Sequence, residues 1–97
     1  MNKSELVDAI AGRTLLPATE VAEVVDELIA VVSRAVTRGE KVVLSGFGTF
    51  LRQPRARRVA RNIWADQKVT VPARNVPVFR PGKPFREAVA RSRIRRT

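Results

Sequence analysis

The chain of 97 residues is long enough for one small domain. Its 19 Lys and Arg exceed its 9 Asp and Glu, so the formal net charge is +10 at pH 7. Because Cys and His are both absent, the sequence excludes disulfides, Cys/His zinc sites, Cys nucleophiles and His acid–base chemistry. No apolar stretch approaches the roughly 20 residues that a membrane span needs. We therefore expect a cytoplasmic protein with no membrane partner, whose first candidate partner is an anionic polymer.

The first helix is predicted to begin at Asn2, whose side chain can cap it. Glu5 follows three residues later and completes a capping-box pattern. Apolar residues then recur at helical spacing as far as Ile10, and Gly12 lies near the expected end of the helix.

A second helix is predicted from about residue 18 to residue 38, because Pro17 suits a helix entry and Gly39 suits a left-handed cap. Apolar residues occupy eleven of the sixteen positions from 21 to 36. A helix that packs on one side needs a narrower apolar stripe than this. The second helix is therefore expected to contact both its own chain and another.

We expect a homodimer, because roughly seventy residues remain for a core once a projecting arm is set aside, and oligomerisation commonly stabilises such small cores. A heterodimer with a related chain would meet the same need. The alternative is that the same apolar residues form an ordinary monomer core. The predicted dimer core consists of Val25, Leu28, Ile29, Val32, Leu44, Phe47, Phe50 and Phe79.

β structure is predicted over residues 41–51, where Gly46-Phe47-Gly48 turns the chain between two strands. Two further segments, 69–71 and 75–79, have strand character. Gly82, Lys83 and Pro84 then introduce a short final helix.

Positive charge is concentrated in the second half of the chain. Residues 1–50 carry five basic and seven acidic residues, whereas residues 51–97 carry fourteen basic and two acidic ones. The segment 52–75 is rich in arginine and has no large apolar face, so we predict an extended basic arm. The planar donor fork of arginine suits phosphate. The alternative is a solvated strand pair without a partner, which would leave its self-repulsion uncompensated.

Ile63 and Trp64 lie near the far end of the predicted arm, where a monomer is expected to avoid large apolar groups. Either side chain could insert between base steps and kink a duplex. Trp64 could instead stack on an unpaired base, or both could pack on the arm or on a neighbouring molecule. We predict that Ile63 is the wedge, with Trp64 as a second candidate.

With these features assembled, the sequence closely resembles the HU/IHF family of bacterial histone-like, DNA-bending proteins, and it is more similar to HU than to IHF. The resemblance covers roughly residues 1–91. It rests on the following ordered motifs: Met1-Asn2-Lys3-Ser4-Glu5-Leu6, Gly39 with Val42 and Leu44, Gly46-Phe47-Gly48-Thr49-Phe50, Arg58, Ala60-Arg61-Asn62, Pro72, Val76-Pro77 and Phe79-Arg80-Pro81-Gly82-Lys83.

The resemblance implies an α+β fold and an intertwined dimer. Each chain is expected to contribute two N-terminal helices, a three-stranded antiparallel sheet extended into a β-ribbon arm, and a short C-terminal helix. The arms of the family enter the DNA minor groove, and a proline near each tip intercalates. Residues implied to contact DNA are Arg55, Arg58, Arg61, Asn62, Lys68, Arg74, Arg80 and Lys83; the full predicted DNA-binding set also includes Arg52, Arg57, Ile63 and Arg86.

The chain departs from the family pattern at the tip of the arm. The Arg-Asn-Pro of the family becomes Arg61-Asn62-Ile63, and the usual glycine of the arm turn is replaced within Trp64-Ala65-Asp66-Gln67-Lys68. Isoleucine is apolar but lacks the rigid ring of proline, so we expect altered bending.

We treat residues 1–97 as a single domain, with a helical dimerisation part at 1–38, the arm at 52–75 and a basic, phosphate-binding tail at 92–97.

The predicted function is non-enzymatic: a histone-like protein that binds, bends and compacts double-stranded DNA with weak sequence specificity, using no cofactor and no metal. Affinity would come from phosphate contacts, and sequence preference from DNA deformability. Bent, nicked or gapped DNA would be preferred, and the protein would be associated with the nucleoid. The alternatives are an IHF-like, site-specific architectural factor and an RNA-binding protein. An enzyme is disfavoured because no residue constellation supports a reaction.

Overall fold

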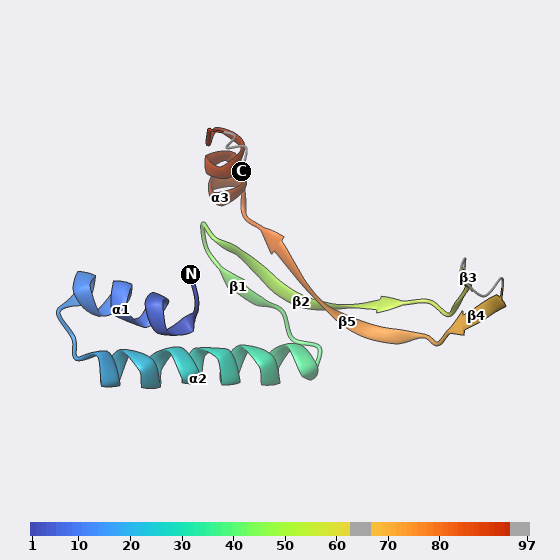
Figure 1. Ribbon diagram of the computed structural model, residues 1–97, viewed down its shortest axis with the longest axis horizontal. Coiled ribbons are helices and arrows are strands. Elements are labelled where there is room, and N and C mark those ends of the chain that lie inside the picture. Colours follow the sequence, from blue (N-terminus) through green and yellow to red (C-terminus); the bar gives the residue numbers. More distant parts are fainter. Residues whose placement is uncertain (63–66, 94–97) are drawn as a thin grey trace. The chain divides into compact units, whose positions relative to one another are not determined.

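The computed structural model describes residues 1–62 and 67–93, which form an α+β protein (Figure 1). The predicted fold class is confirmed by this sequence of helices, antiparallel strands and a final helix. The chain divides into two compact units, Met1–Ala35 and Val36–Thr97. The elements are α1 (Lys3–Thr14), α2 (Ala18–Thr37), β1 (Val42–Leu44), β2 (Gly48–Arg55), β3 (Arg58–Asn62), β4 (Gln67–Val71), β5 (Arg74–Pro81) and α3 (Lys83–Ala90).

Helix α1 begins where the sequence predicts. The backbone N–H of Glu5 donates to Oδ1 of Asn2 at 2.9 Å, which satisfies one of the free N–H groups of the first turn. Gly12 lies near the end of the helix, as predicted, and the helix continues for two residues beyond it to Thr14. The left-handed cap is Leu15, with φ of 60°, and its N–H donates to the Ala11 carbonyl at 2.9 Å.

The helical unit has a small apolar core. Val7 of α1 packs with Val21 and Val25 of α2, and further apolar residues lie against them: Ile10, Ala11 and Ala22. An ion pair between Lys3 and Asp26 also joins the two helices. Much of the apolar surface of α2 stays outside this core, so the helical hairpin on its own leaves a wide apolar face in contact with water.

Leu15 is a site where a substitution should increase stability. A left-handed backbone costs a non-glycine residue about 1–2 kcal/mol, and asparagine tolerates it better than leucine. The side chain is 89% exposed, so little packing would be lost. We expect Leu15→Asn to raise the free energy of unfolding by about 1 kcal/mol, measured by thermal or urea unfolding. Leu16→Asn is the control, since Leu16 has no positive φ; an equal gain in both variants would contradict this explanation.

The second unit contains a three-stranded antiparallel sheet in the order β1-β2-β5. The predicted turn lies between β1 and β2, where Gly46 has a φ of 82° and the N–H of Phe47 donates to the Leu44 carbonyl at 2.9 Å. Gly48 allows close packing, because a Cβ there would lie 2.5 Å from Cε1 of Phe79 and 2.6 Å from the Arg80 carbonyl oxygen. The glycines of this turn therefore serve both its backbone conformation and the packing beneath it.

A second, two-stranded antiparallel sheet is formed by β3 and β4. None of the described helices combines the length and the apolar character that crossing a bilayer requires. Helix α3 begins at Lys83 with Gly82 as its N-cap and a proline in its first turn, as predicted, and Gly82 alone separates it from β5.

Candidate nucleic-acid interface

Two strand pairs in a shared register make up the extended part of the second unit. β2 pairs with β5 from Gly48 opposite Pro81 to Arg55 opposite Arg74. β3 pairs with β4 from Arg58 opposite Val71 to Asn62 opposite Gln67. The two ladders are separated by two residues on each side, so the register is unchanged across the break. We call residues 48–62 and 67–81 the ribbon.

Proline and alanine explain the interruption between the two ladders. Residues 56–57 face residues 72–73 at this point, and Pro72 has no backbone N–H to donate. The break therefore interrupts the hydrogen bonding without shifting the strands. Beyond it, β3 and β4 continue the same ribbon, as Figure 1 shows.

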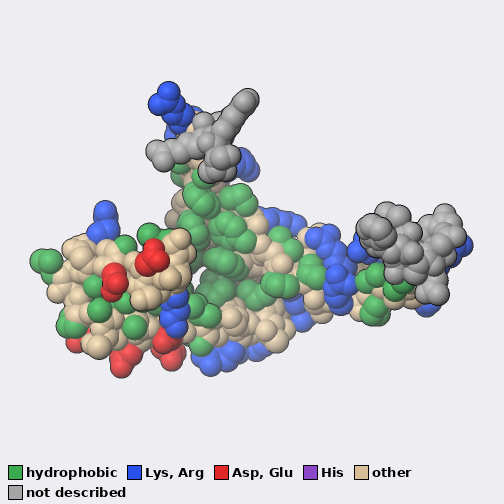
Figure 2. Space-filling model, in the orientation of Figure 1, with side chains coloured by type: hydrophobic (Ala, Val, Ile, Leu, Met, Phe, Trp, Pro, Cys, Tyr) green, Lys and Arg blue, Asp and Glu red, His purple; other side chains and the backbone are tan. Residues whose placement is uncertain are grey.

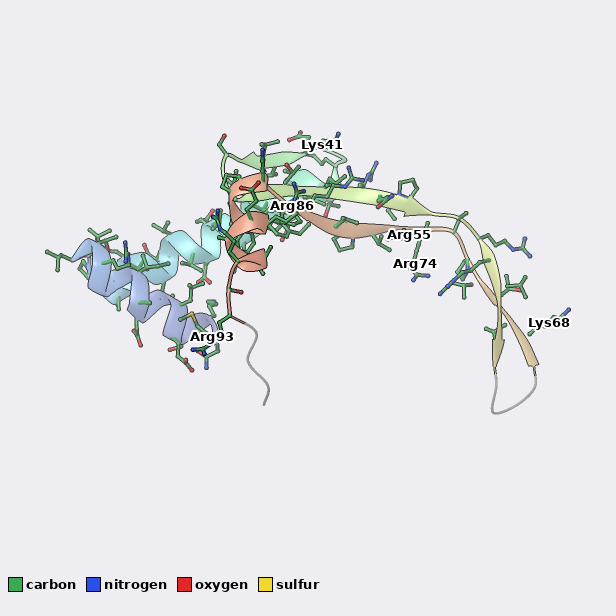
Figure 3. All side chains as sticks on the ribbon, turned by 90° about the horizontal axis from the view of Figure 1, so that it is seen from above. Lys41, Arg55, Lys68, Arg74, Arg86 and Arg93 are labelled. Atoms are coloured by element: carbon green, nitrogen blue, oxygen red, sulfur yellow. The ribbon has the colours of Figure 1, made fainter. Side chains whose placement is uncertain are left out.

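Cationic side chains cover the ribbon, and its strands contain no acidic residue. Figure 2 shows Lys and Arg, in blue, along this part of the surface. The predicted DNA-binding residues of the ribbon whose side chains are described are all exposed: Arg52, Arg55, Arg57, Arg58, Lys68, Arg74 and Arg80. Arg55, Arg74 and Lys68 can be followed in Figure 3. Such a surface has the sign of charge that attracts a phosphate backbone.

Arg52 has a specific contact within the chain. Its Nη1 donates to the carbonyl oxygen of Thr37 at 3.0 Å, at the C-terminal end of α2. A cation is favourable here because the helix dipole places partial negative charge on the last carbonyls. A Cβ at Gly39, where φ is 89°, would lie 3.0 Å from Nη2 of Arg52. The arginine thus packs over the turn that ends the helix, a role that the sequence analysis did not foresee.

Two further predicted DNA-binding residues lie on α3, and both are exposed. Lys83 Nζ lies 3.9 Å from Oε1 of Glu87, one turn later. Arg86, labelled in Figure 3, projects from the same helix. An exposed pair of this kind contributes little to stability, so Lys83 remains available to other anions.

Several sequence-predicted residues lie outside what can be described. Ile63 and Trp64 fall within residues 63–66, which are not among the described residues. Arg61 and Asn62 belong to β3 by their backbones, where they face Lys68 and Gln67. Of the predicted tail at 92–97, the described part is Ser92 and Arg93.

The residues predicted to form a dimer core occupy three kinds of position. Val25 is buried in the helical hairpin of its own chain, Val32 is half-buried, and Leu28 and Ile29 are 50% and 51% exposed. In the second unit, Leu44 is exposed. The remaining residues, Phe47, Phe50 and Phe79, belong to a cluster of aromatic rings.

Four phenylalanines pack together in the second unit. The ring centroid of Phe79 lies 5.2 Å from that of Phe47 and 4.8 Å from that of Phe50. Phe85 of α3 completes the cluster at 5.0 Å from Phe47. Although the four rings contact one another, Phe47 and Phe85 are still exposed, so the cluster is only partly covered by its own chain. Phe85 was expected on the final helix but was not predicted to join this cluster; its spacing of four residues from Val89 was the available signal.

Comparison with known proteins agrees with this geometry. Residues 1–90 match the model of the family described as bacterial DNA-binding protein. The chain belongs to this family. A DNA-binding protein HU from Xylella fastidiosa is 38% identical over 89 residues, which cover 92% of this chain and 95% of the relative. One from Nostoc sp. is 41% identical over 90 residues, with 93% and 96% covered.

Solved structures of the bacterial DNA-binding protein family share the fold. The Anabaena HU–DNA cocrystal structure aligns with a TM-score of 0.88 at 40% identity, covering 95% of this chain and all of that one. HU from Thermotoga maritima aligns with a TM-score of 0.65 at 28% identity, covering 92% of this chain and 98% of that one. The resemblance drawn from the motifs is thereby confirmed.

Proposed function

We propose that this chain is a histone-like architectural protein that binds double-stranded DNA and belongs to the nucleoid. The observation that carries the proposal is the ribbon, whose strands present exposed cations and no carboxylate. Membership of the bacterial DNA-binding protein family supports it, as does the similarity to an HU chain solved with DNA. No catalytic role is proposed for any residue.

Affinity is proposed to come from phosphate contacts by the predicted DNA-binding residues, with the ribbon in the minor groove and Ile63 as the wedge. Sequence preference is then weak, because it arises from how readily the DNA deforms rather than from base contacts. Residues 92–97 add phosphate contacts as a basic tail. Arg52 is an exception within this set, since its contact with the Thr37 carbonyl gives it a structural role as well.

We further propose that the working form is a homodimer. Few hydrophobic residues are buried among those whose side chains the structure describes: Val7, Val21, Val25, Ala35 and Leu51. Exposed apolar residues of α2 and the partly covered phenylalanine cluster supply surface for a second copy. A heterodimer with a related chain would bury the same residues.

Fluorescence anisotropy on matched linear and nicked duplexes across a salt series tests the proposed function. Phosphate binding predicts an affinity that falls steeply with salt, with a slope of about 0.9 per phosphate neutralised. Bending predicts tighter binding to nicked DNA, where deformation is cheaper. Equal affinity for both duplexes would contradict bending, and affinity that is insensitive to salt would contradict phosphate binding.

The same assay separates the alternatives. A site-specific factor would bind one sequence about 10³-fold or more tightly than random duplex. An RNA-binding protein would be displaced from nicked DNA by structured RNA as effectively as by distorted DNA.

A further inference from the structure

The last residue pair of the β2–β5 ladder consists of two arginines. Arg55 lies directly opposite Arg74 in the antiparallel register. Directly opposed residues place their Cβ atoms about 4.5–5.5 Å apart, and their side chains leave the same face of the sheet. The two side chains are exposed and come from neighbouring strands in Figure 3. The fold therefore places two arginines that are nineteen positions apart in the sequence directly opposite each other.

This pairing is unfavourable in the isolated chain. Like charges directly opposite one another destabilise a sheet. The strands of the ribbon contain no carboxylate to offset them. Among the described acidic residues of the second unit, Glu40 pairs with Arg38 at 3.4 Å and Glu87 pairs with Lys83 at 3.9 Å. Neither acid is an ion-pair partner of Arg55 or Arg74.

The surroundings of the pair favour an anion over a protein partner. The adjoining pair on the same face is Gln53 opposite Val76, which is uncharged. On the other side the ladder stops, with the short side chains of Ala56 and Ala73 next along the two strands. Two arginines, each with a planar donor fork, thus leave one face of the ribbon from directly opposed positions at the end of a ladder. One tetrahedral oxyanion can accept charge-assisted hydrogen bonds from both forks.

We propose that Arg55 and Arg74 form one phosphate clamp, in which a single backbone phosphate of the duplex binds between the two guanidinium groups. The proposal rests on the proposed DNA-binding function. It adds that Arg55 and Arg74 bind together, that they bind one phosphate, and that their repulsion lowers the stability of the free ribbon. The bound phosphate removes the repulsion that the pair imposes on the free ribbon. The clamp therefore makes the free protein less stable and the bound protein more tightly held.

The salt dependence of DNA binding tests the stoichiometry. Arg55→Gln combined with Arg74→Gln should lower the slope of log affinity against log salt by about 0.9 for each arm, or about 1.8 for the proposed homodimer, because each arm loses its contact with one phosphate. Arg57→Gln combined with Arg80→Gln is the matched control: it also removes two ribbon arginines from each chain, and Arg80 faces the uncharged Thr49. The control should lower the slope of the homodimer by about 3.6, since each chain loses contacts to two phosphates. A loss of about 3.6 for Arg55 and Arg74 would overturn the clamp.

Thermal unfolding without DNA provides a second readout that does not depend on the proposed function. At matched ionic strength, inorganic phosphate should raise the Tm of the wild-type chain above its value in chloride. This advantage should disappear in the Arg55→Gln/Arg74→Gln variant and persist in the Arg57→Gln/Arg80→Gln control. In low-salt chloride, Arg74→Gln should melt at or above the wild-type temperature, because the repulsion is gone.

The outcomes distinguish a failure of the phosphate clamp from a failure of the proposed DNA-binding function. If the wild-type chain fails to bind duplex but phosphate still protects it through Arg55 and Arg74, the clamp stands and the proposed function fails. If DNA binds but the phosphate advantage survives in the Arg55→Gln/Arg74→Gln variant, the clamp is wrong and the proposed function stands.

Discussion

A Leu28→Asp chain is expected to lose its dimeric form and, with it, at least 100-fold in affinity for duplex DNA. Leu28 lies on α2, where half of its surface is exposed within a single chain. Val24 and Val31, one turn away on either side, are also exposed and continue the same stripe. This exposed stripe, on a helix whose described apolar residues are mostly unburied, is the surface that a second copy is proposed to cover.

The size of the expected effect follows from symmetry. Burial of one leucine side chain contributes about 1.5–3 kcal/mol, and a two-fold dimer loses this contribution twice when Leu28 is replaced. Burying an unpaired carboxylate in its place adds a further penalty. The total of about 5 kcal/mol is comparable with the whole free energy of unfolding of a marginally stable small domain. Both arms then fail to reach the DNA together.

Light scattering after size-exclusion chromatography, combined with anisotropy on nicked duplex, measures both effects. Leu15→Asp is the control, because it places the same charge at an exposed leucine outside the α2 stripe, in a backbone conformation that aspartate tolerates. It should remain dimeric and bind DNA with little change. A dimeric, DNA-binding Leu28→Asp chain would show that the interface lies elsewhere, leaving the phenylalanine cluster as the next surface to test.

Local backbone features were predictable because few residues decide them. The Asn2 cap, the end of α2 at Gly39 and the turn at residues 46–48 each depend on side chains within a few positions of one another. The end of α1 near Gly12 is confirmed to within two residues, but the left-handed cap falls on Leu15 rather than on the glycine.

Contacts between distant segments could not be predicted from composition. Arg52 was assigned to DNA on charge alone, whereas its guanidinium lies fifteen residues away in sequence from the carbonyl it binds. Likewise, arginine density predicted a basic arm but not that Arg55 faces Arg74. That pairing depends on the register of β2 and β5, in which Phe50 is opposite Phe79 and Gly48 leaves room for the ring.

Replacement of Ile63 is expected to alter DNA bending more than any change to a phosphate contact. The family motif has proline where this chain has Ile63, which follows directly after β3 and lies outside the described residues. An apolar wedge lowers the free energy of a kinked step by replacing lost base stacking, and a carboxylate cannot do this. We expect Ile63→Asp to abolish the preference for nicked over linear duplex, and Ile63→Pro to increase it.

Val69→Asp is the matched control for charge. Val69 is an exposed valine of β4, so the substitution adds the same negative charge to the ribbon near its end. Its repulsion should weaken binding to nicked and linear duplex equally and leave their ratio unchanged. Ring closure of short DNA fragments measures bending directly, and thermal unfolding confirms that each variant is folded.

One further comparison decides whether Ile63 or Trp64 is the wedge. If Trp64→Ala abolishes ring closure while Ile63→Asp retains it, the wedge is the tryptophan and the assignment of Ile63 is wrong. If both variants close rings as the wild-type chain does, neither side chain inserts. Binding would then rest on the phosphate contacts proposed for the cations of the ribbon, which hold the DNA backbone without unstacking its bases.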